Sequence, residues 1–205
     1  RATEAADLLR PENRLNMSTF PVMGMQTTYD AHALMTDSAS SATAFACGLK
    51  TQSGVIGMDD TKEHSYKSIA QLAAEQGRRV GVISSVSLDH ATPAAYYASV
   101  PSRGEMNTIA RQMAASGYEF FGGGGLAATT ASTILSDNFV AGGYSVLTTK
   151  DAILDLKKKP KSRVYCINPE LQDAKAMPYA IDRTDKGLSL AEMTEVAISV
   201  LKDGP

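Results

Sequence analysis

The sequence predicts an α/β fold built on a largely parallel sheet. Helix-like and strand-like stretches alternate along the chain, without an internal repeat or a low-complexity linker. Short apolar runs such as residues 80–83 are typical of strands that are buried on both faces of a parallel sheet. The 205 residues are 43% hydrophobic and 20% charged, which is sufficient for a sizeable core. We therefore expect residues 1–205 to form a single α/β domain.

A helix is expected to begin at Asp37 and Ser38. Asp37 and Ser38 carry side-chain oxygens that can cap the free N–H groups of a first helical turn. Small residues follow as far as Cys47, and Gly48 is placed to end the helix. The N–H groups and the positive end of the helix dipole would then face whatever Ser38 attacks, which suits phosphate. Taken alone, the same residues also fit the cap of a buried, alanine-rich helix without a catalytic role.

The remaining elements follow from apolar spacing, helix caps and glycine stops. Ile69 and Leu72 recur at helical spacing, and Gly117 is placed to end a later helix. Near the end of the chain, Ser189 and Glu192 have the spacing of a capping box. In chain order we expect a helix over residues 65–77 capped by Ser65, a strand over 80–83, a helix over 105–116, a strand over 118–121, a strand over 144–147, a short helix over 151–158, a strand over 163–167 and a helix that begins after Ser189.

Two loops follow predicted strands and could carry a site. Ligands of open α/β sheets bind beyond the carboxyl ends of strands, so His90 and Thr92 in the loop over residues 84–93 lie where a site is expected. After the next strand, Gly122-Gly123-Gly124-Gly125-Leu126-Ala127 fits the pattern of a dinucleotide-binding turn. A tight turn explains these glycines equally well, because consecutive threonines make the following stretch a poor helix start.

Charge and composition argue against several classes of protein. Twenty basic residues are offset by twenty-two acidic ones, and aromatic residues are scarce, so we expect no nucleic-acid-binding surface. No apolar run reaches the ~18 residues that a membrane-spanning helix needs, and we expect no membrane association. Cys47 and Cys166 lack metal-binding spacing and could form a disulfide or remain thiols, of which a buried thiol is favoured for Cys47.

Two separate blocks of sequence resemble the alkaline phosphatases. The block Asp37-Ser38-Ala39-Ser40-Ser41-Ala42-Thr43-Ala44, continued by Gly54-Val55-Ile56-Gly57, resembles the nucleophile segment of that family. The block His90-Ala91-Thr92-Pro93-Ala94-Ala95, followed by Ser102-Arg103, resembles a second segment in the same order and at matching spacing. The resemblance continues through Phe121-Gly122-Gly123-Gly124 to the helix after Ser189, and it is weakest between Leu126 and Asp185.

The resemblance implies a role for five residues. Ser38 matches the phosphorylated nucleophile, which also binds zinc, and Asp37 matches the acid beside it that helps to hold an arginine. Arg103 matches that arginine, whose planar fork can grip two phosphoryl oxygens. Thr92 matches a hydroxyl ligand of a third metal site, usually magnesium, and His90 falls where relatives carry aspartate or histidine near that metal.

The activity implied by the resemblance is hydrolysis of phosphate monoesters through a phosphoseryl intermediate, assisted by two Zn²⁺ and one Mg²⁺. The implied fold is a doubly wound, largely parallel sheet with helices on both faces, incomplete in this chain. The family further implies a homodimer in the periplasm or outside the cell, with phosphate monoesters and inorganic phosphate as its ligands. Most metal ligands of the family match no position in the sequence. The chain is therefore expected to be a portion of a longer phosphatase and to be inactive by itself.

Two other functions are compatible with parts of the sequence. A serine acyl-hydrolase would use Ser38 as nucleophile, although Ser38 lacks the Gly-x-Ser-x-Gly context and no histidine is indicated as its base. A non-catalytic nucleotide-binding domain would instead use the turn from Gly122 to Ala127. Zinc-dependent phosphate inhibition, fluorophosphonate labelling of Ser38 and saturable NAD binding would distinguish the three.

Overall fold

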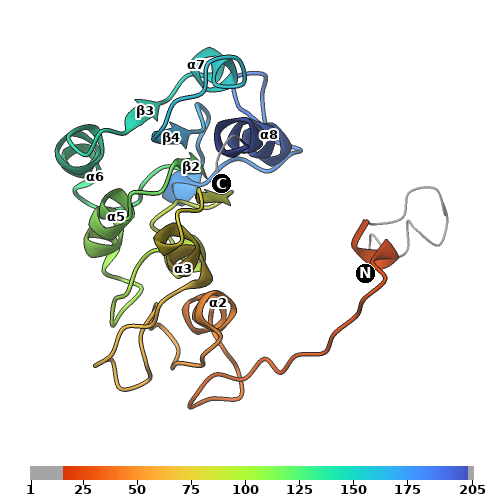
Figure 1. The fold of residues 1–205 in the computed structure, drawn as a ribbon, viewed down its shortest axis with the longest axis vertical. Coiled ribbons are helices and arrows are strands. Elements are labelled where there is room, and N and C mark those ends of the chain that lie inside the picture. Colours follow the sequence, from red (N-terminus) through yellow and green to blue (C-terminus); the bar gives the residue numbers. More distant parts are fainter. Residues whose placement is uncertain (1–15, 203–205) are drawn as a thin grey trace.

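A four-stranded parallel sheet lies at the centre of the computed structural model, which describes residues 16–202 (Figure 1). The strands are arranged in the order β1-β2-β4-β3, and every neighbouring pair is parallel. Their bounds are β1 Gly81–Ser84, β2 Phe120–Gly123, β3 Ser145–Leu147 and β4 Val164–Ile167. The predicted α/β class and parallel sheet are thus confirmed.

Helices cover both faces of this sheet (Figure 1). Those that contribute to the core on one face are α2 Ser38–Cys47, α3 Ile69–Glu75, α4 Ala91–Ala94, α5 Met106–Ala115 and α6 Ala131–Ile134, the last continued by the π-helical turn η3 Leu135–Val140. Helices α7 Lys150–Asp155 and α8 Leu190–Leu201 cover the other face. Two short 3₁₀ turns complete the described structure, η2 Asn16–Thr19 and η4 Asp173–Lys175.

The alternation of side chains along the strands divides the core between the two faces. Phe120 packs with α7 and α8, whereas its neighbour Phe121 belongs to the core beneath α4 and α5. On the neighbouring strand β4, Tyr165 pairs in register with Phe121, and their rings lie 6.5 Å apart. All three aromatic side chains are fully buried, so the two strands are fixed to helices on both sides.

One predicted helix start was wrong. Helix α3 is capped by Ser68 rather than Ser65, because the Ser68 hydroxyl accepts the Gln71 N–H while the Gln71 side chain accepts the Ser68 N–H. Ser65 instead forms an isolated antiparallel bridge with Met58. The other predicted helices and strands are present with ends shifted by a few residues.

Helix α6 and the turn η3 were not expected from the sequence. Burial explains them: Ile134 and Phe139 are completely buried, and the Phe139 ring lies 5.2 Å from the rings of both Tyr144 and Tyr165. Packing against this aromatic cluster outweighs the poor helix propensity of the preceding threonines.

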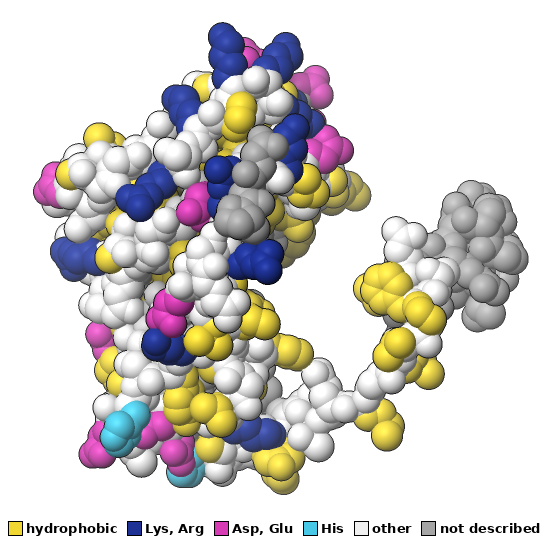
Figure 2. Space-filling model, in the orientation of Figure 1, with side chains coloured by type: hydrophobic (Ala, Val, Ile, Leu, Met, Phe, Trp, Pro, Cys, Tyr) yellow, Lys and Arg dark blue, Asp and Glu magenta, His cyan; other side chains and the backbone are white. Residues whose placement is uncertain are grey.

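The segment before α2 contrasts with this core. Residues 20–25 run as an extended chain away from the body of the protein, and apolar side chains stand out along the segment in Figure 2. Met23 and Met25 are almost completely exposed, as is Leu34 closer to α2. Within residues 16–202, no helix combines the length and the apolar character needed to cross a bilayer.

Candidate active site

The N-terminus of α2 is organised by a reciprocal capping box. Asp37 Oδ1 accepts hydrogen bonds from the Ser40 N–H and the Ser40 hydroxyl, each at 2.9 Å. In return, Ser40 Oγ accepts the Asp37 N–H at 3.3 Å. Of the two possible caps, Asp37 is the one used, so helix α2 begins at Ser38. The Ser38 side chain lies in the first turn with the positive end of the helix dipole behind it.

Arg103 reaches this helix end from a loop far along the chain. Its backbone N–H donates to the Gly54 carbonyl at 2.7 Å, which fixes the loop beside the segment that follows α2. Its Nη1 donates to Asp37 Oδ2 at 3.0 Å and to Ser38 Oγ at 3.1 Å. The structure thus brings together the predicted nucleophile, acid and arginine. The Arg103 side chain remains 35% exposed, so an approaching anion can still reach the guanidinium.

Hydrogen bonds keep Asp37 ionised. Partial burial raises the pKa of its carboxyl group, but hydrogen bonds from the N–H groups of Ser40 and Gly54, the Ser40 hydroxyl and Arg103 more than offset that effect. The net result is a pKa below the ordinary value for aspartate. Asp37 is therefore a carboxylate at neutral pH and a permanent partner for the Arg103 guanidinium.

His90 contacts the same arginine from the opposite side. Arg103 Nη2 lies 3.2 Å from His90 Nε2, and because arginine can only donate, Nε2 is the acceptor. Burial, followed by the positive charge of Arg103, lowers the pKa of His90. The ring is therefore neutral, with its proton on Nδ1, which is buried without a partner among the described residues.

Thr92 lies on α4, two residues after His90. Its side chain is exposed, and no hydrogen bond of its hydroxyl is formed within residues 16–202. The same part of the chain contains no group of three or more His, Cys, Asp or Glu side chains that could hold a metal ion. His90 and Thr92 thus share one short element, but the described residues do not make a complete site for zinc or magnesium.

Sequence reasoning assigned no role to Ser40 or Asp89. Ser40 lies inside the quoted motif, and its position three residues after Asp37 is the signal for a capping box. Asp89 precedes His90 in the loop after a strand, which is where an acidic residue merits attention. Its carboxylate accepts two backbone N–H groups from the loop that follows β2.

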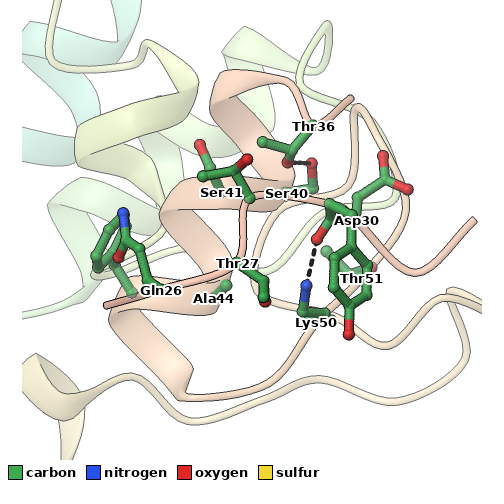
Figure 3. A pocket seen from close by; sticks show the side chains of 12 residues that line it. Gln26, Thr27, Asp30, Thr36, Ser40, Ser41, Ala44, Lys50 and Thr51 are labelled. Carbon is green, nitrogen blue, oxygen red and sulfur yellow. Dashed lines mark hydrogen bonds between the residues drawn. The ribbon is translucent and has the colours of Figure 1, made fainter. Parts of the chain in front are cut away.

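A pocket of about 200 Å³ lies beside α2, between the helix and residues 26–30 (Figure 3). Ser40 lines it, and Figure 3 shows the Ser40 hydroxyl joined to that of Thr36, 2.6 Å away. The pocket therefore reaches the capping box through Ser40 but is not lined by Ser38, Arg103 or His90.

The glycine turn after β2 is explained by close packing. A Cβ atom on Gly123 would lie 1.9 Å from the Ser84 carbonyl oxygen, and one on Gly124 would lie 2.3 Å from that of Val86. The next helix, α6, begins only at Ala131 and has four residues, so no helix N-terminus follows the turn directly. These features do not support the dinucleotide-binding alternative.

The acyl-hydrolase alternative lacks a base. Among residues 16–202, no histidine is hydrogen-bonded to Ser38. The histidine of the candidate site, His90, is hydrogen-bonded to Arg103 instead. Cys47 and Cys166 are both free thiols, half-buried and buried respectively, so no disulfide joins them.

Comparison with known proteins gives matches that all belong to one family. The family model described as alkaline phosphatase matches residues 2–123. Alkaline phosphatase 4 of Bacillus subtilis is 35% identical over 187 residues, which cover 87% of this chain and 39% of the relative. The tissue-nonspecific alkaline phosphatase of Homo sapiens is 36% identical over 101 residues, 45% of this chain and 19% of the human protein. The chain thus spans about two fifths of the length of the Bacillus relatives it matches.

Solved structures agree with this result. The alkaline phosphatase of the Antarctic bacterium TAB5 superposes with a TM-score of 0.81 at 29% identity, over 98% of this chain and 57% of that enzyme. A mutant of the TAB5 enzyme is described with Mg bound in the M3 site. The enzyme of Thermus thermophilus superposes with a TM-score of 0.79 at 26% identity, over 98% of this chain and 43% of that chain.

Proposed function

Because the chain belongs to the alkaline phosphatase family, we propose that the complete protein hydrolyses phosphate monoesters and releases inorganic phosphate. The observation that carries this proposal is the convergence of three side chains at one helix N-terminus: the Ser38 hydroxyl, the Arg103 guanidinium and the Asp37 carboxylate. A hydroxyl beside a cation, at the positive end of a helix dipole, suits attack on a dianionic phosphate.

Ser38 would act as the nucleophile. Its hydroxyl proton is released to solvent as Oγ bonds to phosphorus and the bond from phosphorus to the ester oxygen breaks, and the departing alkoxide takes up a proton from water and leaves as the alcohol. Water then hydrolyses the phosphoserine, which releases phosphate and regenerates the hydroxyl. The contact from Arg103 to Ser38 Oγ supports this role, because a phosphoryl group bonded to Oγ would have its oxygens within reach of the guanidinium.

Arg103 would bind the phosphoryl group, with Asp37 and His90 holding its guanidinium in place. The two contacts at Nη1 and the one at Nη2 restrict rotation of the side chain, so little conformational freedom is lost when phosphate binds. The neutral ring of His90 adds no positive charge of its own. The plane of the guanidinium can then present two N–H groups to two oxygens at once.

Metal ions are part of this proposal, as two Zn²⁺ and one Mg²⁺. The side chains that this chain would bring near them are Ser38, His90 and Thr92, while most ligands would come from other parts of the complete protein. When bound, the ions would supply positive charge that stabilises the oxygens of the nucleophile and the leaving group. The magnesium reported in the M3 site of a TAB5 phosphatase mutant supports a metal requirement.

The family relationship also supports two broader proposals. The complete protein would act in the periplasm or outside the cell, and it would form a homodimer. Both could be examined on the complete protein, by cell fractionation and by light scattering.

Trapping of phosphate on Ser38 tests the proposed mechanism. When the complete protein is quenched in acid during turnover, mass spectrometry should find phosphate on the peptide that contains Ser38. Ser38→Ala should abolish that signal and lower kcat/KM by on the order of 10³-fold or more. Ser41→Ala is the matched control, because Ser41 lies in the same helix and, within residues 16–202, its hydroxyl forms a hydrogen bond only to the Ser38 carbonyl. Full activity in Ser38→Ala, or phosphate on another residue, would contradict the mechanism.

A further inference from the structure

The loops that follow β1 and β2 are tied together along their backbones. The Gly124 N–H donates to the Ser84 carbonyl at 3.2 Å, and the Leu88 N–H donates to the Gly125 carbonyl at 2.9 Å. The absence of side chains at Gly123 and Gly124 is what allows this approach. The two loops therefore behave as one unit at the carboxyl edge of the sheet.

Asp89 completes this unit with its side chain. Its Oδ1 accepts the Ala127 N–H at 3.0 Å and its Oδ2 accepts the Ala128 N–H at 2.7 Å, across 38 and 39 residues of chain. The side chain is completely buried, and within residues 16–202 it forms no salt bridge. A buried carboxylate with two backbone donors is held far more rigidly than one facing solvent.

The residue after Asp89 leads directly into the candidate active site. His90 Nε2 accepts from Arg103 Nη2, and Arg103 Nη1 donates to Ser38 Oγ. The backbone of His90 is itself held, since its N–H donates to the Ser87 carbonyl at 3.0 Å. Any shift of Asp89 would therefore move the His90 ring, which is the hydrogen-bond partner of Arg103 Nη2.

We propose that Asp89 is a positioning residue for phosphate binding: by anchoring its loop to Ala127 and Ala128, it fixes His90 and through it the orientation of Arg103. This inference rests on the proposed function of the same site. Asp89 itself touches neither Ser38 nor Arg103 through any hydrogen bond of the described chain. Its influence must pass through the adjoining peptide and the imidazole.

Asp89→Asn is the most informative substitution. Asparagine keeps the size of the side chain but offers one oxygen, so its NH₂ group would face a backbone N–H and one of the two contacts would be lost. A buried polar group without a partner would then loosen the loop. In the complete protein we expect kcat/KM to fall about 10-fold, with a parallel weakening of inhibition by inorganic phosphate.

A double-mutant cycle separates positioning from general stability. If Asp89 acts through Arg103, Asp89→Asn should cost about twofold or less once Arg103→Lys is present, because the oriented fork is already lost. Equal losses in both backgrounds would overturn the proposal. Asn168→Ala serves as the control, since Asn168 is also buried after a strand but anchors Glu170 and Leu188 instead. Its effect should be the same in both backgrounds.

Hydrogen exchange tests the same link without any substitution. When inorganic phosphate saturates the complete protein, exchange at the Ala127 and Ala128 amides should slow, while exchange at Glu170 and Leu188, held by Asn168, should not change. Unchanged exchange at Ala127 and Ala128 while phosphate binds would overturn the proposal even if Asp89→Asn does not fold. Absence of both turnover and phosphate binding in the unmodified protein would instead count against the proposed function.

Discussion

Helices α2 and α8 both begin with a reciprocal capping box. At α8, the Ser189 hydroxyl accepts the Glu192 N–H at 3.1 Å, and Glu192 Oε2 accepts the Ser189 N–H at 2.8 Å. At α2, Asp37 and Ser40 exchange the equivalent bonds. The two helix ends therefore satisfy their first backbone donors in the same way and through the same kind of residues.

The two helix ends differ in what the carboxylate of the capping box binds. Glu192 accepts both the N–H and the hydroxyl of Ser189 with the same oxygen, so the hydrogen bonds of this carboxylate stay within the capping box of α8. Asp37 uses one oxygen for the cap and offers the other to Arg103, which lies 66 residues further along the chain. At α2 the second carboxylate oxygen of Asp37 therefore binds Arg103, whose guanidinium also contacts the Ser38 hydroxyl. This contact distinguishes the candidate active site from a purely structural helix cap.

Arg103→Lys should produce the largest contrast between the two helix ends. Lysine keeps the charge but cannot contact Asp37, Ser38 and His90 at once. We therefore expect kcat/KM of the complete protein to fall by an amount that corresponds to a loss of about 1.5–3 kcal/mol in transition-state stabilisation. Inhibition by phosphate should weaken as well. Steady-state kinetics with phosphate as inhibitor would measure both. Arg79→Lys is the control and should leave both values unchanged, because the Arg79 side chain donates only to the Val200 carbonyl in the part of the chain that the structure describes. Unaltered phosphate affinity in Arg103→Lys would remove this residue from the site.

Asp37→Asn should have an intermediate effect. The amide retains a cap for the Ser40 N–H but loses the charge that holds Arg103, so kcat/KM should fall by about 1–2 kcal/mol in transition-state free energy. Glu192→Gln makes the same chemical change at α8 and should not alter kcat/KM, because no arginine of residues 16–202 is hydrogen-bonded to that carboxylate. If the two substitutions changed activity equally, the distinction between the helix ends would be wrong.

Ser189→Ala should have the smallest effect, confined to stability. Loss of the cap should lower the free energy of unfolding by about 1 kcal/mol without changing kcat/KM, as measured by denaturant titration and kinetics on the complete protein. Ser199→Ala, which removes a hydroxyl from a partly exposed position of the same helix, should change stability by no more than a few tenths of a kcal/mol. A loss of activity in Ser189→Ala would contradict a purely structural role for this cap.

Local patterns in the sequence were sufficient for the parallel strands and for the starts of α2 and α8. The start of α3 was placed at Ser65 because spacing alone does not distinguish it from Ser68, whose cap depends on Gln71. Helix α6 was missed because its stability comes from burial of Ile134 among residues distant in sequence.

The candidate site shows the same limit. The start of α2 was predictable from Asp37 and Ser38, but the approach of Arg103 was indicated only by resemblance to a family. The bonds from Asp89 to the loop after β2 connect residues that nothing in the sequence relates. Contacts across such separations depend on the tertiary fold, which apolar periodicity and helix caps do not specify.

Methionine side chains in the extended segment before α2 are more accessible to oxidants than those in the core. Thioether groups there are open to solvent and to oxidants, whereas Met113 and Met193 are completely buried in the two halves of the core. The exposed methionines are Met23 and Met25 in this segment, with Met17 before it and Met35 after it. Mild peroxide would therefore convert these side chains to sulfoxides first, and their protection in the complete protein would reveal how much of the segment is covered by the rest of the polypeptide or by a second subunit.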